Sequence, residues 1–180
     1  MSGWSSQCNY LVCIIDTHYT FSVVKEMITR MPSLAKEVDE KGMTPLHCAC
    51  QKGDFEVVKA HVSLLNSKEA LQAKDSDGNT PLHLSCRSLS VKIIKYLISK
   101  GADMNARNKM ELTPLHIATQ CGYITAAEIL VQEGAEVNCQ DERWCTPLHY
   151  AAMRNSTDLV CLLCKGCVSL LFTVPFIQQR

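Results

Sequence analysis

Apolar and polar residues along the chain are arranged in short segments with helical spacing, separated by turn residues. Two examples are residues 57–58 and residues 93–98, whose apolar side chains are spaced to line one face of an α-helix. Each such segment follows a shorter run of apolar and small residues, and a break rich in glycine or polar residues separates the two. The pattern therefore predicts successive pairs of short helices in an all-α protein.

The tetrapeptide Thr-Pro-Leu-His marks the start of the first helix in four of these pairs. It begins at Thr44, Thr80, Thr113 and Thr146, at intervals of 36, 33 and 33 residues. Threonine is a good helix N-cap, and proline suits the first helical position because no amide hydrogen is needed there. Four copies at nearly constant spacing indicate an array of structural repeats.

The period and the tetrapeptide resemble the ankyrin repeat. This resemblance implies an all-α solenoid of stacked helix-turn-helix units with β-turn tips. Each unit begins at an Asp or Asn, a turn-forming residue, five residues before its threonine. The predicted organisation is a degenerate N-terminal repeat or cap (1–38), three full repeats (39–74, 75–107 and 108–140), an incomplete repeat (141–166) and a divergent apolar tail (167–180).

Variation between the units predicts local differences in backbone. The tip glycine of the first two units is replaced by Glu111 and Trp144 in the last two. The glycine between the two helices is replaced by Leu89 in the second unit and by Asn155 in the fourth. Asparagine tolerates a left-handed backbone but leucine does not, so we expect the second unit to make this turn differently.

Length also varies between the units. The first unit has three extra residues, which we place in residues 65–70 as a loop at the end of its second helix. Gly101 and Gly134 are predicted to end the second helix of their units, and Gly166 falls one residue short of that register. The apolar residues beyond Gly166 indicate either a longer array that has been cut or a tail that folds back as a cap, and self-association through this tail is possible.

Charge excludes several classes of partner. The 180 residues contain 18 basic and 18 acidic side chains, so the chain is neutral and lacks the basic footprint of a protein that binds nucleic acid or an anionic membrane. No apolar run approaches the roughly 18 residues of a membrane span, and the N-terminus lacks the features of a secretory signal. We expect a cytoplasmic protein, with a nuclear location also possible.

Eleven cysteines raise the question of disulfides and metal sites. Cys48, Cys50 and Cys86 occupy positions that face the core in the repeat alignment, which favours free thiols in a reducing compartment. Cys161, Cys164 and Cys167 have a spacing that can ligate zinc, but the alignment places Cys164 in the core and Cys161 in solvent. With no fourth ligand evident, we expect no metal or cofactor, and a thiol or metal sensor is kept as an alternative function.

The histidines of the four tetrapeptides do not indicate catalysis. One per unit, they would lie roughly 10 Å apart in a stacked array, too far for a shared metal or a catalytic pair. In ankyrin-like proteins this histidine bonds locally and braces the turn. No nucleophile elbow, phosphate loop or metalloprotease helix is present, so we expect no enzymatic activity.

The resemblance implies a non-enzymatic scaffold or adaptor that binds a protein or peptide partner along the tips and the ends of the first helices. An alternative is a regulatory segment of a larger channel, kinase or ubiquitin-ligase adaptor. Trp144 is either an anchor for the partner or packs against the neighbouring turn. The implied binding residues are Glu40, Lys41, Met43, Gln51, Lys52, Ser76, Asp77, Asn79, Arg87, Ser88, Lys109, Met110, Leu112, Gln120, Cys121, Glu142, Arg143, Trp144, Cys145, Met153 and Arg154.

One candidate modification site follows from the same resemblance. The stretch that ends Glu136-Val137-Asn138 resembles the site at which an asparagine hydroxylase modifies many ankyrin repeats. Asn138 is therefore a possible hydroxylation site. The alternative is that this asparagine only satisfies backbone groups of its turn.

Overall fold

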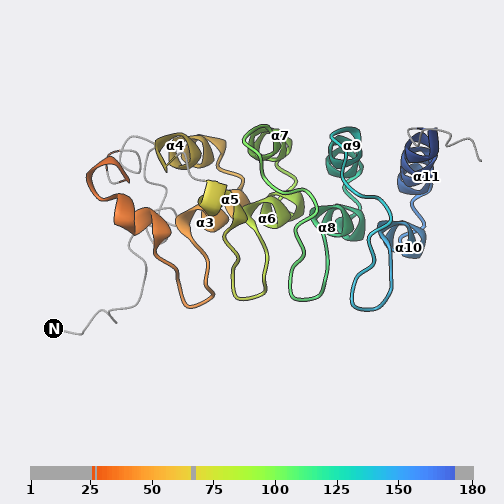
Figure 1. Ribbon diagram of the computed structural model, residues 1–180, viewed down its shortest axis with the longest axis horizontal. Coiled ribbons are helices and arrows are strands. Elements are labelled where there is room, and N and C mark those ends of the chain that lie inside the picture. Colours follow the sequence, from red (N-terminus) through yellow and green to blue (C-terminus); the bar gives the residue numbers. More distant parts are fainter. Residues whose placement is uncertain (1–25, 27, 66–67, 173–180) are drawn as a thin grey trace, which may run out of the picture.

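Helix pairs stack side by side in a single row, with loops projecting from one edge (Figure 1). The computed structural model describes residues 26, 28–65 and 68–172. Within these residues there are helices and turns but no strand, which confirms the all-α expectation. The elements are η1 (Pro32–Lys36), α3 (Pro45–Lys52), α4 (Phe55–Leu65), α5 (Lys68–Gln72), α6 (Pro81–Arg87), α7 (Val91–Ser99), α8 (Pro114–Cys121), α9 (Ile124–Gln132), α10 (Pro147–Met153) and α11 (Thr157–Phe172).

The helices form two layers. The inner row, α3, α6, α8 and α10, lies next to the projecting loops, and the outer row is α4, α7, α9 and α11 (Figure 1). Each inner helix packs against its own outer helix and against the inner helices of the adjoining units. No helix in the described ranges has the length and hydropathy needed to cross a membrane.

The threonine of each tetrapeptide begins its inner helix as predicted. Thr44, for example, has an extended backbone with ψ 164°, and its side chain accepts a hydrogen bond from the amide of His47. The ring of His47 in turn accepts a bond from the Thr44 amide, at 3.1 Å. The bond from the threonine amide to the histidine ring forms at all four inner helices, and the threonine side chain accepts the histidine amide at α3 and α8.

The projecting loops, called tips below, all have one backbone shape. In the first, the amide of Gly42 donates to the carbonyl of Asp39 at 2.9 Å, and Oδ1 of Asp39 accepts from the amides of Lys41 and Met43. The side-chain oxygen of the first residue makes equivalent bonds in the other three tips. This explains why every unit begins with Asp or Asn.

The turn between the two helices of the second unit differs from the one that the sequence predicts. Leu89 adopts φ 55°, close to the φ 53° of Asn155, so the second unit uses the left-handed turn of the others. The amide that follows bonds back to the inner helix in the same way, from Ser90 to the carbonyl of Ser85. The prediction of a different turn is therefore wrong. The bond of the Ser90 amide and a bond from the hydroxyl of Ser88 to the carbonyl of Cys50 in the first unit, at 2.8 Å, hold the segment in a conformation that leucine disfavours.

Two other segments differ from expectation. The insertion in the first unit does lie after the second helix, but residues 68–72 form the short helix α5 rather than a loop. Gly166 lies inside α11, which continues to Phe172. A Cβ on Gly166 would lie 3.1 Å from a methyl of Val131 and 3.2 Å from one of Val137, so glycine here permits close packing of α11 on the third unit. Most of the predicted N-terminal cap lies outside the described residues, although Ile28 is buried in the core.

The core lies between the two rows and repeats from unit to unit. Leu46, Leu82 and Leu115 of the inner helices are fully buried. Cys50 and Cys86 are also fully buried, as the sequence alignment predicts. Each fully buried leucine of this kind contributes about 1.5–3 kcal/mol of apolar burial.

His61 is an exception within this core. It occupies the position that Leu97, Leu130 and Leu163 fill in the other outer helices, and it is fully buried. Neither ring nitrogen has a hydrogen-bond partner among the described residues. The nearby backbone of Ala35 acts to raise the pKa of this ring, but burial outweighs it. Burial therefore lowers the pKa of His61 to about 4.

This burial gives a prediction for His61→Leu. Leucine removes an unsatisfied buried group, so the variant should gain roughly 1–3 kcal/mol of unfolding free energy at pH 7. Below pH 6.5 the unfolded chain protonates this histidine and the folded chain does not, so the wild type should lose up to about 3 kcal/mol more than the variant between pH 6.5 and pH 4.

Urea unfolding of both proteins at pH 7, 6, 5 and 4 measures this difference. His83, whose pKa burial also lowers to about 4, titrates in both proteins and cancels in the comparison. A constant difference across this pH range would contradict the account.

Candidate partner-binding surface

The tips are joined edge to edge by one backbone hydrogen bond at each junction. The amide of Ser76 donates to the carbonyl of Lys41 at 2.8 Å, and that of Lys109 donates to Asp77 at 2.9 Å. At the last junction the amide of Glu142 donates to the carbonyl of Met110 at 3.2 Å. The tips therefore form one continuous edge and not four independent loops.

The tetrapeptide histidines fasten each unit to the next. Nε2 of His83 lies 3.0 Å from the carbonyl of Leu112, and Nε2 of His116 lies 3.2 Å from that of Cys145. Because Nε2 faces a carbonyl and Nδ1 faces the Thr amide of the same unit, each ring is held as the neutral tautomer with its proton on Nε2. Burial lowers the pKa of both rings, which also favours the neutral form.

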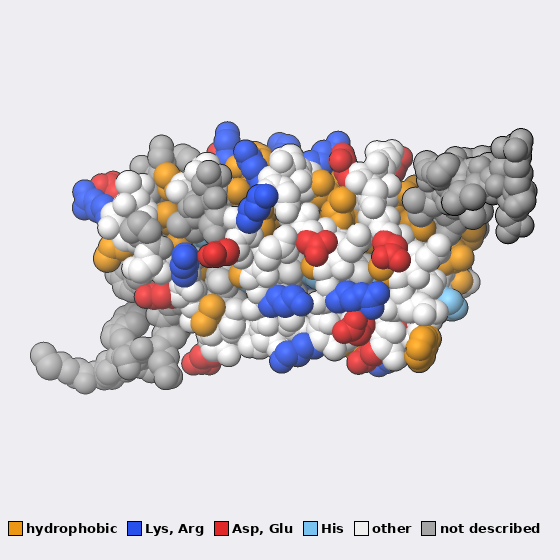
Figure 2. Space-filling view, in the orientation of Figure 1, with side chains coloured by type: hydrophobic (Ala, Val, Ile, Leu, Met, Phe, Trp, Pro, Cys, Tyr) orange, Lys and Arg blue, Asp and Glu red, His pale blue; other side chains and the backbone are white. Residues whose placement is uncertain are grey.

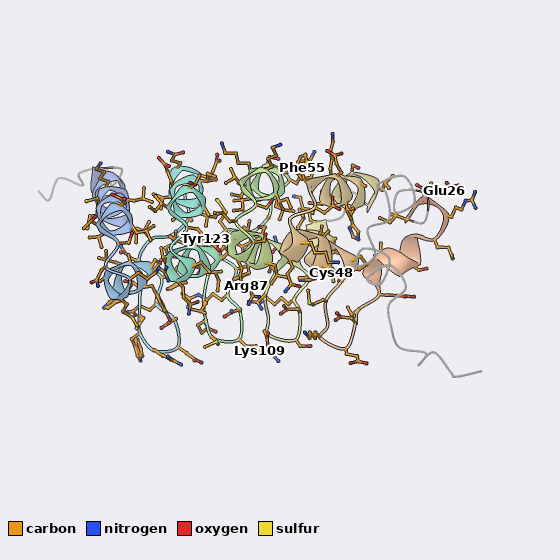
Figure 3. All side chains as sticks on the ribbon, turned by 180° about the vertical axis from the view of Figure 1, so that it is seen from behind. Glu26, Cys48, Phe55, Arg87, Lys109 and Tyr123 are labelled. Carbon is orange, nitrogen blue, oxygen red and sulfur yellow. The ribbon has the colours of Figure 1, made fainter. Side chains whose placement is uncertain are left out.

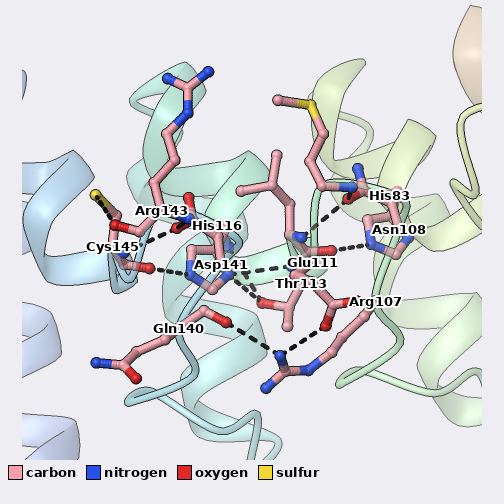
Figure 4. A network of polar contacts seen from close by, with 12 residues as sticks. His83, Arg107, Asn108, Glu111, Thr113, His116, Gln140, Asp141, Arg143 and Cys145 are labelled. Atoms are coloured by element: carbon pink, nitrogen blue, oxygen red, sulfur yellow. Dashed lines mark hydrogen bonds and ion pairs between the residues drawn. The ribbon is translucent and has the colours of Figure 1, made fainter.

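Buried side chains reinforce the second junction (Figure 4). The side-chain Nδ2 of Asn108 donates to Oδ1 of Asn79 at 2.9 Å, which links two neighbouring tips. On the solvent side, Arg107 pairs with Glu111 at 2.9 Å and donates to the carbonyl of Gln140 in the next unit. The surface of units two and three is therefore held in one geometry before any partner binds.

Asp141 begins the last tip, and its side chain bonds the backbone of that tip. Burial opposes its ionisation, but the hydroxyl of Tyr150, at 2.6 Å, and the amides of Cys145 and Arg143 bond its carboxylate and lower its pKa. Burial and this same bond raise the pKa of Tyr150 to about 12. The carboxylate of Asp141 therefore serves to hold the backbone of the last tip in place.

A strip of exposed side chains runs across the ends of the inner helices. Lys52, Arg87 and Arg154 are exposed, and no carboxylate is among the implied binding residues at these ends. Arg154 donates to the carbonyl of Gln120 at 3.0 Å, across the junction between units three and four. Figure 3 places Arg87 between the helices and the tips, and Lys109 at a tip. We call this strip the basic strip, comprising Gln51, Lys52, Arg87, Ser88, Gln120, Cys121, Met153 and Arg154.

Cys121 lies within this charged surface. The cations of Arg87 and Arg154 act to lower the pKa of its thiol, but burial outweighs them and the pKa is raised. The thiol is half-buried and flanked by positive charge. It therefore belongs to the basic strip without being an activated nucleophile.

Three implied binding residues are not available to a partner. Met43 and Leu112 are 8% and 4% exposed, and both belong to the hydrophobic core. Asn79 is 5% exposed and bonds Asn108. The fifth residue of the first three tips turns inward, above the helix start, and this direction cannot be read from a tip's polarity. Of the other implied residues, Ser88, Cys121 and Cys145 are half-buried and the remainder are exposed.

Trp144 projects from the last tip. Its side chain is 76% exposed, and its backbone has φ 62°, close to the φ 68° of Gly42 at the same tip position. Met110, 44% exposed, occupies the preceding position in the neighbouring tip. The structure therefore does not pack Trp144 down against the neighbouring turn. Acidic, basic and hydrophobic side chains are interspersed near the tips in Figure 2.

A shallow hollow of about 390 Å³ lies beside Trp144. Its lining includes four carboxylate residues and one guanidinium, and that guanidinium already pairs with Glu111. Sequence reasoning did not find this hollow, because its residues come from loops of units two, three and four that only the stacking brings together. The lining comprises Arg107, Glu111, Glu136, Asn138, Cys139, Gln140, Asp141, Glu142 and Trp144.

Comparison with known families agrees with this architecture. A family model described as ankyrin repeats in three copies matches residues 11–108, 61–141 and 101–170. The chain belongs to the ankyrin repeat family. Ankyrin repeats are generally protein–protein interaction modules and are typically non-enzymatic. A comparison with curated proteins finds no significant match.

The ankyrin scaffold also settles the placement of the C-terminal cysteines. Cys161 is exposed as predicted, but Cys164 is exposed too, so its expected core position is wrong. The counterparts of Cys164, Ile98 and Val131, are half-buried, and α11 covers Val131. The described residues contain no group of three side chains arranged to hold a metal, and the side chain of Cys167 lies outside them.

Asn138 is exposed, between the buried residues Val137 and Cys139. Burial and the neighbouring Glu136 raise the pKa of the Cys139 thiol to about 11. Because Asn138 is exposed, its side chain lies on the surface of the last full repeat. Its hydroxylation stays a prediction.

Trp144→Gly tests whether this tip is strained. Glycine adopts positive φ without a steric penalty, so the variant should gain up to about 1 kcal/mol of unfolding free energy. Gly78→Ala is the opposite change, because a Cβ there would lie 2.8 Å from the amide nitrogen of Lys109, at φ 79°. It should cost about 1–3 kcal/mol. Loss of stability in Trp144→Gly would mean that the indole packs against the protein after all.

The thiols should differ in reactivity. Cys50 and Cys86 are fully buried and burial strongly raises the pKa of each, whereas Cys161 and Cys164 are exposed. A maleimide added to the native, reduced protein should label Cys161 and Cys164 quickly, and Cys50 and Cys86 only after denaturation. Peptide mapping reads out each site, and rapid native labelling of Cys50 would contradict the core described above.

Proposed function

We propose that this ankyrin-repeat protein is a non-enzymatic scaffold or adaptor that binds an acidic or amphipathic peptide segment of a partner protein. The observation that carries the proposal is the basic strip. Its three cations, Lys52, Arg87 and Arg154, are exposed at the ends of the inner helices of the first, second and fourth units. An extended acidic segment laid across the units would meet a positive charge in the first, second and fourth units.

Exposed apolar side chains border the strip and the tips. Met153 is 75% exposed at the end of α10, and Trp144 and Met110 are exposed at the tips of units four and three. Tryptophan in particular is enriched among residues that dominate binding energy, and methionine adapts to irregular partner surfaces. The combination suits a peptide that carries both carboxylates and apolar side chains.

The stacked tips support this function mechanically. Backbone bonds between neighbouring tips and the histidine bonds between units hold the binding residues in place. A partner therefore binds without first ordering the surface, which reduces the entropic cost of association. Attraction between the cations and an acidic partner also raises the association rate at low ionic strength.

Fluorescence anisotropy with two labelled peptides tests the proposal. Both peptides carry the same apolar residues, and one carries glutamate where the other carries lysine. The glutamate peptide should bind more tightly, and its affinity should fall as salt rises. The combined variant Arg87→Ser with Arg154→Ser should reduce this preference, and Met110→Ser or Trp144→Ser should each cost about 1–3 kcal/mol of binding free energy.

Matched controls lie on the outer row. Lys92 and Lys95 are exposed on α7, away from the tips, so changing both to serine removes the same charge without touching the proposed surface. These controls should bind the glutamate peptide as the wild type does. Leu112→Ser is not a binding test, because loss of a buried side chain should lower folding stability instead. Equal binding of both peptides, or loss of binding only in the α7 variant, would refute the assignment.

A further inference from the structure

The turn between the two helices of a unit, called the interhelix turn below, exposes apolar side chains in the second and third units. Leu89, in the interhelix turn between α6 and α7, is 44% exposed, and Ile124, which follows the turn of the third unit, is 39% exposed. Glycine or asparagine occupies the position of Leu89 in the other units, at Gly53, Gly122 and Asn155. Units one and three flank Leu89 on either side, so its exposure does not come from lying at an end of the row (Figure 1).

The backbone of Leu89 has a conformation that leucine disfavours. Its φ of 55° lies in the left-handed region, which Gly53 and Gly122 adopt at φ 77° and 79° without a steric penalty. Burial of an apolar side chain could offset this strain, but Leu89 keeps a large exposed surface. Strained residues concentrate at functional sites, so this leucine indicates a contact with a molecule outside the chain.

Positive charge lies beside this turn. Arg87 ends α6 two residues before Leu89, its side chain is exposed, and it forms no ion pair with another residue that the structure describes. Arg87 and Arg154 both act on the thiol of Cys121 in the third unit, so the two guanidinium groups lie near it. Cys121 directly precedes Gly122, the counterpart of Leu89 in the adjoining unit. Two cations therefore accompany the exposed leucine.

Gly122 leaves the room that the side chain of Arg154 occupies. A Cβ at Gly122 would lie 2.6 Å from Nε of Arg154 and 2.8 Å from Nη2, so the guanidinium lies directly over this backbone. Nη1 of the same group donates to the carbonyl of Gln120 at 3.0 Å. One cation is therefore held on the interhelix turn of the third unit, next to the turn that carries Leu89.

We infer that the interhelix turns of units two and three are the docking site for a short motif of the partner that combines one apolar side chain with neighbouring carboxylates. The apolar side chain contacts Leu89, and the carboxylates pair with Arg87 and Arg154. A carboxylate can form two parallel hydrogen bonds with a guanidinium, which fixes the orientation of the motif. The inference rests on the proposed peptide binding, and it adds the motif and Leu89, a position that the family resemblance does not imply.

Fluorescence anisotropy with two labelled acidic peptides tests the inference. The peptides are identical except that one has a leucine between glutamates and the other has an alanine in its place. The wild type should bind the leucine peptide about tenfold more tightly. Leu89→Gly should bind the two peptides equally, whereas its melting temperature should rise because glycine accepts positive φ without strain.

Leu89→Asn provides a second variant. Asparagine tolerates this backbone, as Asn155 does at φ 53°, so the variant should also lose the preference for leucine without losing stability. Asn155→Gly is the matched control, because it changes the same position of another interhelix turn and removes no apolar side chain. The control should keep the preference. Loss of affinity in a variant that is as stable as the wild type cannot come from unfolding.

Three outcomes overturn the inference. A wild type that binds both acidic peptides equally, or a Leu89→Gly variant that keeps the preference, places the apolar contact elsewhere and leaves the proposed function standing. A lower melting temperature of Leu89→Gly means that the leucine serves the fold and not a partner. If the wild type binds neither peptide, the proposed binding of acidic segments fails, and the docking motif fails with it.

Discussion

The hydrogen bond from a tetrapeptide histidine to the carbonyl of the next tip is the interaction on which the arrangement of units depends. One ring joins two levels of structure, because Nδ1 completes the cap of its own helix and Nε2 fixes the following unit. Burial keeps the ring neutral, and a neutral ring is the form that accepts on one side and donates on the other. Helix start, tip and stacking are therefore set together, and the exposed surface inherits its geometry from buried groups.

The sequence predicted the helix pairs, the units and the family, because these depend on local signals that recur at a fixed period. Thr-Pro at each inner helix and Asp or Asn at each tip act within a few residues, and repetition distinguishes them from chance. Predictions failed where a neighbouring unit decides the outcome. Leu89 adopts the left-handed turn of the other units although leucine disfavours it, and Cys164 is exposed because no described element covers it.

The candidate surface was predictable in outline only. Repeat alignment identified the tip positions, and most of them are exposed. It could not show that the fifth tip residue turns inward, which removes Met43, Asn79 and Leu112 from the surface. Nor could it show that Arg87, Cys121 and Arg154 lie near one another, since they come from three different units and their proximity follows from the stacking distance alone.

The row of units also has a mechanical consequence. Among the described residues, the main helix–helix contacts lie within a unit or between adjoining units. A pulling force on the two ends would therefore be resisted by one junction at a time, and the units would detach in sequence. The array would extend in steps of one repeat under load and shorten again as each unit folded back onto its neighbour.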